Sequence, residues 1–297
     1  MPSPSSLCFL FVVNPASGSA EKTDWATTIA DYFAPLPHTA EVLTLTGHDD
    51  GPALQARIAS QRPHRLVAVG GDGTVKIVAA EAIAANLPLA VLPAGSANGM
   101  AKELNLPSAP TEALRIAVHG TEKAVDVLYL NGTDLCLHLS DIGLNAQLVR
   151  YAQNQNWRGM LGYARAAFWS LLRRRLMRVR IQCDHEQVER TAFMVVLANA
   201  RVYGTGATIN PNGDVSDGRF EVVVLRRLVG RELLKMFWRF QPFNPTAVEI
   251  FSTTTVSLEI TRPVDFQVDG EYRGKTTRVD VEIRPGALRV LVPDSVA

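Results

Sequence analysis

The chain has 297 residues, of which 47% are hydrophobic, with 30 Lys and Arg against 29 Asp and Glu. This composition excludes a disordered chain and leaves room for two domains with sizeable cores, and the net charge of +1 indicates no particular partner. Three widely spaced cysteines fit neither a disulfide framework nor a zinc site and are typical of a reducing cytoplasm. The apolar run 7–13 is too short to span a membrane and predicts a buried strand.

Strand and helix patterns alternate along the first 125 residues. Strands are expected at 7–13, 39–46, 65–69 and 89–92, and helices at 21–33, 51–60, 75–85, 99–104 and 111–119. Continuous apolar strands in this order predict a parallel α/β domain over residues 1–125, with helices on both faces of its sheet. Loops at the carboxyl ends of such strands are where ligands bind.

The pattern changes after residue 125, where runs rich in Val, Ile and Thr alternate with turn signals. Strands are expected at 125–130, 134–142, 177–184, 191–198, 219–224, 254–260, 264–268, 277–283 and 287–292. We therefore expect an antiparallel β-sandwich or barrel over residues 126–286, with helical inserts at 157–176 and 230–239. The last strand, near 287–297, is expected to return to the first domain.

Three loops in the first domain are chemically unusual: 14–18, 70–74 and 93–99. A Gly-rich turn between a strand and a helix can point backbone N–H groups at a phosphate. Asp72 within such a turn either faces a metal ion, a sugar hydroxyl or a proton donor, or simply caps the helix. Ser96 likewise either caps a helix or reaches a nucleotide.

These loops resemble those of the diacylglycerol kinase catalytic-domain family, the lipid kinases that include bacterial YegS-like proteins and sphingosine kinases. The family is related in its nucleotide loop to NAD kinases and phosphofructokinases, which implies a nucleotide-binding first domain of that type. Matching segments occur in the expected order along nearly the whole chain, at 14–18, 70–74, 93–98, 141–146, 214–218 and 268–271.

The resemblance implies roles for individual residues. It implies an ATP site at Asn14, Pro15, Ala16, Ser17, Gly18, Thr46, Gly70, Gly71, Asp72, Gly73, Thr74, Val75, Lys76, Ile77, Gly95, Ser96 and Asn98. It also implies a magnesium ion held by Asp214, Asp217 and the backbone carbonyl of Arg219. Glu271 would be the general base, with Asp269 beside it, and Asp72 would lie near phosphate and metal.

This chemistry suits the residue types, because phosphoryl transfer needs positioning, charge neutralisation and a base for the attacking hydroxyl. The chain departs from the family pattern at three positions. Gly99 stands where an Asp is usual, Ser96 replaces a Thr, and Lys76 replaces a neutral polar residue.

Two segments combine basic and aromatic residues: 157–180, whose seven arginines have no acidic residue among them, and 226–243. Such segments can lie on an anionic bilayer, or their apolar side chains can pack on the sandwich while the arginines are solvated. We expect a cytoplasmic protein that associates peripherally with the inner face of the membrane. No nucleic-acid-binding motif accompanies the arginines, so no nucleic-acid partner is expected.

The sequence thus predicts an ATP-dependent lipid kinase that transfers the γ-phosphoryl group to the hydroxyl of a diacylglycerol-like or related lipid. Two alternatives stay open: an NAD-kinase-like enzyme with a soluble acceptor, and a non-catalytic lipid- or nucleotide-binding regulator. Pairing of two copies through an edge of the second domain, giving a homodimer, is also open.

Overall fold

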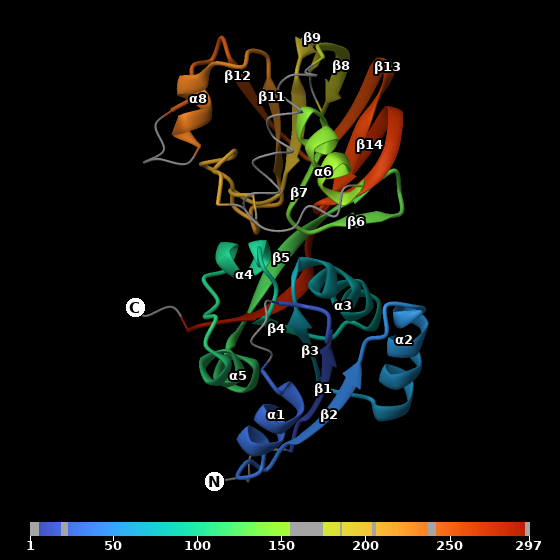
Figure 1. The fold of residues 1–297 in the computed structure, drawn as a ribbon, viewed down its shortest axis with the longest axis vertical. Helices are drawn as coiled ribbons and strands as arrows, with labels where there is room; N and C mark the ends of the chain where they lie inside the picture. The colour runs from blue at the N-terminus through green and yellow to red at the C-terminus, as the bar shows by residue number, and fades with distance from the viewer. Residues whose placement is uncertain are drawn as a thin grey trace. The chain divides into compact units, whose positions relative to one another are not determined.

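The computed structural model describes residues 6–18, 23–154, 175–184, 186–203, 206–236 and 242–294 (Figure 1). The chain divides into two compact units. Unit 1 comprises Met1–Val125 and Gly286–Ala297, and unit 2 comprises Asp126–Pro285. Two strands, β5 (Thr121–Leu130) and β14 (Glu271–Val292), run from one unit into the other.

Unit 1 is built on a parallel sheet. Its strands are β1 (Cys8–Val13), β2 (Thr39–Thr44), β3 (Arg65–Gly70), β4 (Leu89–Pro93) and the last part of β14. They lie in the order β2-β1-β3-β4-β14, and each of these pairings is parallel. Apolar residues run without interruption along the central strands because both faces of the sheet are covered.

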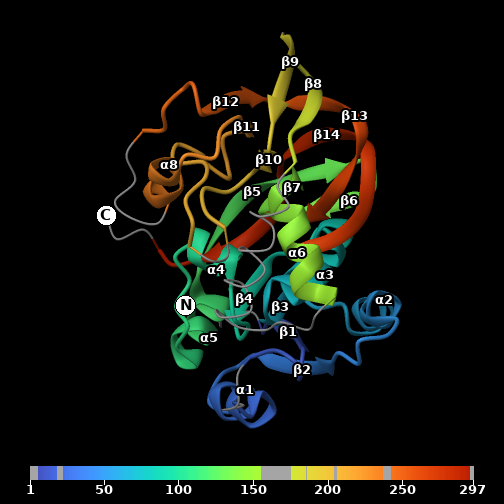
Figure 2. The same cartoon turned by 45° about the horizontal axis from the view of Figure 1, so that its top comes forward.

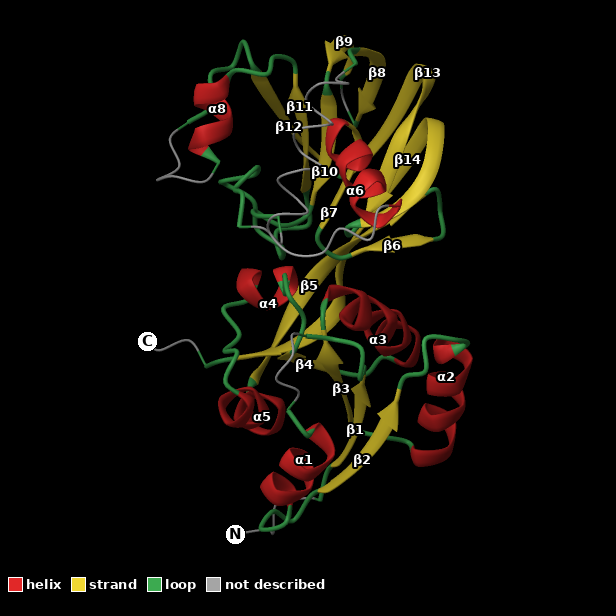
Figure 3. Ribbon diagram, in the orientation of Figure 1, coloured by secondary structure: helices red, strands yellow, loops and turns green. Residues whose placement is uncertain are grey.

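Helices cover the two faces of this sheet (Figure 3). They are α1 (Trp25–Phe33), α2 (Asp50–Gln61), α3 (Asp72–Ala85), the short α4 (Gly99–Glu103) and α5 (Pro110–His119). The pair α1 and α5 lies on one side of the sheet and the pair α2 and α3 on the other. Phe9 and Phe11 of β1 meet the ring of Phe33 edge-on, with ring centroids 5.1 and 5.5 Å apart, in the core under α1.

Unit 2 is an antiparallel structure. Its strands are β6 (Asp134–Cys136), β7 (Leu139–Gly143), β8 (Met177–Cys183), β9 (Gln187–Ala192), β10 (Met194–Ala198), β11 (Phe220–Leu225), β12 (Val248–Thr253) and β13 (Thr255–Val268), with parts of β5 and β14. The main order is β12-β11-β10-β7-β13-β14, while β8 joins β13 to β9 and β6 pairs with β5. The parallel α/β region followed by antiparallel strands confirms the predicted fold class.

Helix α6 (Leu144–Asn154) contacts β7 and β13 and was not predicted, because the segment 141–146 resembles a Gly-rich strand end (Figures 1 and 2). Strands β9 and β12 were also missed. The first predicted helical insert, 157–176, lies outside the described residues over 157–174, and the second, 230–239, does so over 237–239. The described part of the second insert contains α8 (Gly230–Lys235).

Two strand predictions differ from the structure in a physically clear way. The expected strand 134–142 is broken into β6 and β7, because the backbone N–H groups of Leu137 and His138 donate to the Asp269 carboxylate. The expected strands 254–260 and 264–268 form the single strand β13, whose pairing with β14 shifts register between Glu259 and Val264.

Candidate functional site

The parallel register of unit 1 brings the three Gly-rich loops to one edge of its sheet. Val13 at the end of β1 pairs with Val69, and Gly70 at the end of β3 pairs with Pro93 at the end of β4. The segments that follow these strands are therefore neighbours. This is the carboxyl edge, where parallel α/β sheets bind ligands.

Hydrogen bonds join the loops directly. The backbone N–H of Asn14 donates to Val69 O at 3.0 Å, and its side-chain Nδ2 donates to Thr74 Oγ1 at 3.1 Å. Ala94 N donates to Gly70 O at 2.9 Å. Thr74 is 2% exposed, so its hydroxyl supports the loop from within rather than from its surface.

The glycines of these loops are needed for close backbone approach. A Cβ added to Gly95 would lie 2.4 Å from the Cα of Gly71, and one added to Gly18 would lie 2.8 Å from Ala94 O. A Cβ on Gly70 would strike the Thr74 side chain at 2.4 Å. The loops thus form a cradle with no room for side chains, which suits a phosphate held by backbone N–H groups and fits the predicted ATP site.

Helix α3 begins at Asp72, three residues earlier than the predicted start at Val75, and its N-cap is Gly71 without a side-chain cap. The first turn of α3 therefore lies within the segment 70–74, and the backbone N–H groups of this turn have no partner inside the helix. Asp72 is not the cap of its own helix, as one sequence alternative had it. Its Oδ1 accepts the N–H of Met100 in α4 at 3.3 Å, a contact that links two of the loops.

Asn98, rather than Ser96, is the N-cap of α4 and adopts a left-handed conformation with φ of 50°. Its side chain both accepts from Gly95 N at 2.9 Å and donates to Gly95 O at 2.8 Å, so it shapes the third loop. Ser96 itself is exposed at the loop surface. Its hydroxyl is therefore open to solvent at the predicted nucleotide site.

The first loop is organised by its own asparagine. Asn14 Oδ1 accepts Ala16 N at 2.9 Å and Asn14 O accepts Ser17 N at 3.1 Å, which leaves Pro15 and Ala16 exposed. Gly18 follows with φ of 94°, a conformation that glycine adopts without strain.

Among the remaining predicted contacts, Val75 is 2% exposed and packs in the core, so only its backbone can face a ligand. Gly73 is exposed, and Lys76 and Ile77 are half-buried in α3. Thr46 lies beyond β2 in a turn held by Asp50, whose Oδ1 accepts Thr46 N at 2.8 Å. This bond lowers the pKa of Asp50.

In unit 2, Asp269 and Gly270 form the two-residue hairpin between Val268 and Glu271, with φ of 50° and 82°. The Asp269 carboxylate accepts Leu137 N at 3.1 Å and His138 N at 2.9 Å, and Cys136 Sγ at 3.3 Å. Asp269 therefore fixes the connection between β6 and β7.

Glu271, the predicted base, is the first residue of β14. Its Oε2 pairs with Arg273 Nη2 at 2.8 Å, and its side chain is 45% exposed. The Glu271 side chain is therefore accessible to a ligand from solvent. Glu271 belongs to unit 2, whereas the three Gly-rich loops belong to unit 1.

Asp126, a residue that sequence reasoning missed, forms hydrogen bonds that hold the predicted metal loop, 214–219. Asp126 is 2% exposed, its Oδ2 accepts Gly218 N at 2.7 Å, and its N–H donates to Val215 O at 2.7 Å. Asp214 Oδ1 accepts both Ser216 N and Ser216 Oγ, and Asp217 Oδ1 accepts Arg219 N at 2.9 Å.

Oxygen donors of this kind are the ligands that magnesium prefers. Across the part of the chain that the structure describes, however, no group of three or more His, Cys, Asp or Glu side chains is arranged to hold a metal ion. An ion on Asp214, Asp217 and the Arg219 carbonyl would need water or phosphate oxygens to complete its shell. Magnesium at this loop stays a prediction.

A buried polar network surrounds Asp141, which the sequence placed in a motif without identifying its partners. Asp141 is fully buried, and its Oδ2 accepts from Asn145 Nδ2 and Gln267 Nε2 at 2.6 Å and from Tyr203 Oη at 3.1 Å. Burial raises the pKa of Asp141 to about 6. The partners come from α6, β13 and a distant loop, so only the fold brings them together.

Comparison with known proteins gives these sites a family. The diacylglycerol kinase catalytic domain matches residues 8–130, and the YegS C-terminal NAD kinase beta sandwich-like domain matches residues 140–292. The solved structure of a diacylglycerol kinase from Bacillus anthracis str. Sterne has the same fold, with a TM-score of 0.77 at 19% identity over 99% of this chain and 100% of that one.

Relatives found by comparison of sequences are similar along most of the chain. A probable lipid kinase YegS-like of Yersinia enterocolitica is 29% identical over 77% of this chain and 78% of its own length. A diacylglycerol kinase of Mycobacterium tuberculosis is 26% identical over 88% of both. An uncharacterized protein of Synechocystis sp. is 29% identical over 77% of this chain, which spans only 54% of that protein. The chain therefore belongs to the diacylglycerol kinase family, with the catalytic domain followed by the YegS-type C-terminal domain.

Proposed function

We propose that this protein is an ATP-dependent lipid kinase that transfers the γ-phosphoryl group of ATP to a lipid hydroxyl, in the manner of diacylglycerol kinases. The observation that carries the proposal is the cradle of unit 1, where three loops meet so closely that a Cβ on Gly95 would overlap Gly71. A backbone surface of this kind at a helix N-terminus binds phosphate chains. Membership of a kinase family supports phosphoryl transfer as the reaction.

In this proposal bound ATP supplies the phosphoryl group, and Mg²⁺ neutralises part of the phosphate charge. The backbone N–H groups of the three loops hold the phosphates, and Asn14 and Asn98 keep those loops in place. Glu271 takes the proton of the lipid hydroxyl as its oxygen bonds to the γ-phosphorus and the bond to the departing ADP oxygen breaks. Arg273, whose Nη2 lies 2.8 Å from Glu271 Oε2, holds this carboxylate in position.

The direct test incubates the full chain with radiolabelled ATP and Mg²⁺, together with either a bacterial lipid extract or NAD. Label in a lipid, with the mass of one added phosphate, supports the proposal. Label in NAD favours the NAD-kinase-like alternative, and no transfer to either favours the non-catalytic regulator. Glu271→Gln and Asp72→Ala should abolish transfer, and Arg115→Ala, which removes an exposed arginine paired with Glu112 on α5, serves as the control.

A membrane-lipid substrate also calls for a way to reach the bilayer. Within the described ranges, no helix is both long and apolar enough to cross a membrane. We infer peripheral binding through the basic segments 157–180 and 226–243, as the sequence suggested, although 155–174 and 237–241 lie outside the described residues. The described end of the first segment leads to a more specific inference.

A further inference from the structure

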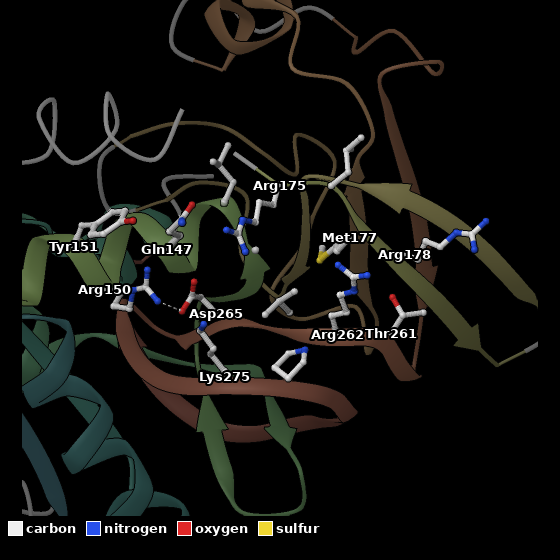
Figure 4. A pocket seen from close by; sticks show the side chains of 15 residues that line it. Gln147, Arg150, Tyr151, Arg175, Met177, Arg178, Thr261, Arg262, Asp265 and Lys275 are labelled. Atoms are coloured by element: carbon white, nitrogen blue, oxygen red, sulfur yellow. Dashed lines mark hydrogen bonds and ion pairs between the residues drawn. The ribbon is translucent and has the colours of Figure 1, made fainter. Parts of the chain in front are cut away.

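A cavity of about 1020 Å³ lies within unit 2, beside α6 (Figure 4). Its walls come from α6, from the residues around the start of β8, from the middle of β13 and from β14. The cavity was not predicted, because no single sequence motif contains its lining. Figure 4 shows Arg150, Arg175 and Lys275 reaching toward the same part of the cavity from three different elements.

The charge of this cavity is strongly one-sided. Among the described residues that line it, five side chains are cationic and Asp265 is the one carboxylate: Arg150, Arg175, Arg178, Arg262, Lys275 and Asp265. Asp265 is already satisfied, since its Oδ1 accepts from Arg150 Nη1 and from Tyr272 Oη, both at 2.8 Å. The other cations keep their full charge for a ligand.

The unpaired state of these cations distinguishes them from the other arginines of unit 2. Among the described residues, Arg175, Arg178, Arg262 and Lys275 form no ion pair, as the salt bridges of the unit lie elsewhere. Arg180, two residues after Arg178 on the same face of β8, pairs with Glu189 at 3.0 Å and Glu259 at 3.3 Å.

The cavity also carries apolar surface at its edge. Leu176 lines it and is 56% exposed, the largest exposed fraction among the big apolar side chains described. An exposed leucine between arginines is typical of a surface that meets lipid, because the apolar side chain gains by leaving water while the cations meet phosphate. A free phosphate ion offers nothing for this leucine to contact.

We propose that this cavity binds the phosphate of an anionic phospholipid headgroup, with Arg175, Arg262 and Lys275 as its cationic ligands and Leu176 against the acyl region. The proposal rests on the proposed function only in taking a lipid as the ligand. It differs from diffuse attraction to a membrane, because it assigns the affinity to unpaired cations in one cavity.

The test measures sedimentation of the full chain with vesicles, without ATP, so that it does not depend on kinase activity. Vesicles of phosphatidylcholine are compared with vesicles that also contain phosphatidylglycerol. Each cation near a membrane surface contributes on the order of fivefold in partitioning, so the double variant Arg262→Ala, Lys275→Ala should weaken binding to the anionic vesicles by about 25-fold. The matched control, Arg278→Ala, Arg284→Ala, removes the same charge from paired residues outside the basic segments and should change binding by less than about threefold.

Three outcomes would overturn the proposal. Equal loss in the two double variants would show that net charge alone governs binding, and unchanged binding in the cavity variant would place the lipid site elsewhere. Binding of inorganic phosphate that is lost in the cavity variant, while both double variants bind vesicles like the unmodified chain, would assign the cavity to the free ion. Circular dichroism of both double variants checks that each is folded. If the unmodified chain transferred phosphate to lipid but did not bind anionic vesicles, this proposal would fail and the proposed function would stand.

Discussion

The contact between Gly71 and Gly95 offers the sharpest test of the nucleotide cradle. Gly95→Ala places a Cβ 2.4 Å from the Cα of Gly71, whereas ordinary van der Waals contact begins at 3.4 Å. The two loops must therefore separate by about 1 Å, the difference between these distances. Gly95 does not have a positive φ, so the penalty comes from this overlap and not from the conformation of its backbone.

The expected cost follows from that separation. Overpacking of this kind lowers the free energy of unfolding by about 1–3 kcal/mol. A displacement of about 1 Å in a group that positions a substrate lowers kcat/KM on the order of 100-fold. Gly71→Ala is expected to act in the same direction but more weakly, because its Cβ would lie 3.2 Å from Gly95 Cα.

Gly51→Ala is the matched control. Its Cβ would lie 3.9 Å from the side chain of Glu81, within α2, where alanine favours the helix by about 1 kcal/mol. Urea unfolding gives the stability of the three variants, and isothermal titration calorimetry gives their affinity for ATP. If Gly95→Ala bound ATP as tightly as the unmodified chain and unfolded at the same urea concentration, the cradle would not be the nucleotide site.

Three further predictions concern unit 2. Glu271→Gln should abolish lipid phosphorylation while changing the free energy of unfolding by less than about 0.5 kcal/mol, since the side chain is exposed. Asp269→Ala should lower the free energy of unfolding by about 2–3 kcal/mol, because two backbone N–H groups lose a charged acceptor. Urea unfolding and a phosphorylation assay separate the two effects, and an active Glu271→Gln protein would contradict the assignment of the base. Burial raises the pKa of Asp141 in the folded state from its ordinary value of 3.8 to about 6. The folded state therefore binds this proton more tightly than the unfolded chain, and about 3 kcal/mol of stability is lost as pH rises from about 4 through 6. Asp141→Asn should remove this pH dependence from urea unfolding, and equal pH dependence in the two proteins would assign it to other groups. Mg²⁺ should raise the melting temperature of the unmodified chain but not of Asp217→Ala, and no rise in either protein would argue against the metal loop.

The sequence identified the three Gly-rich loops because each of them is local, whereas nucleotide binding by these loops stays a prediction. A Gly-rich segment after an apolar strand is visible in a short window, and the parallel register then sets the loops side by side. The bonds between the loops were not visible. The link between Asp72 and Met100 joins residues 28 positions apart, and nothing in either segment alone predicts it.

Unit 2 was harder to predict, because its chemistry depends on strands that are distant in sequence. The turn at Asp269 and Gly270 was recognised, but the hydrogen bonds from Leu137 N and His138 N to the Asp269 carboxylate were not. For that reason a single strand was expected where β6 and β7 lie. Asp126 and the partners of Asp141 were missed for the same reason. A buried carboxylate leaves no periodic signal, since its partners are chosen by the fold rather than by neighbouring residues.

Strand β14 has a consequence for how the chain folds. Its residue Val290 pairs with Leu89 of β4, so the sheet of unit 1 includes a strand made after all of unit 2. During synthesis β4 stays an open sheet edge while 160 residues, Asp126–Pro285, emerge from the ribosome. Unit 2 can fold as it appears, whereas unit 1 completes its sheet only with the last strand. A shortened chain that ends near Val125 would therefore expose the edge of β4 and be prone to aggregate.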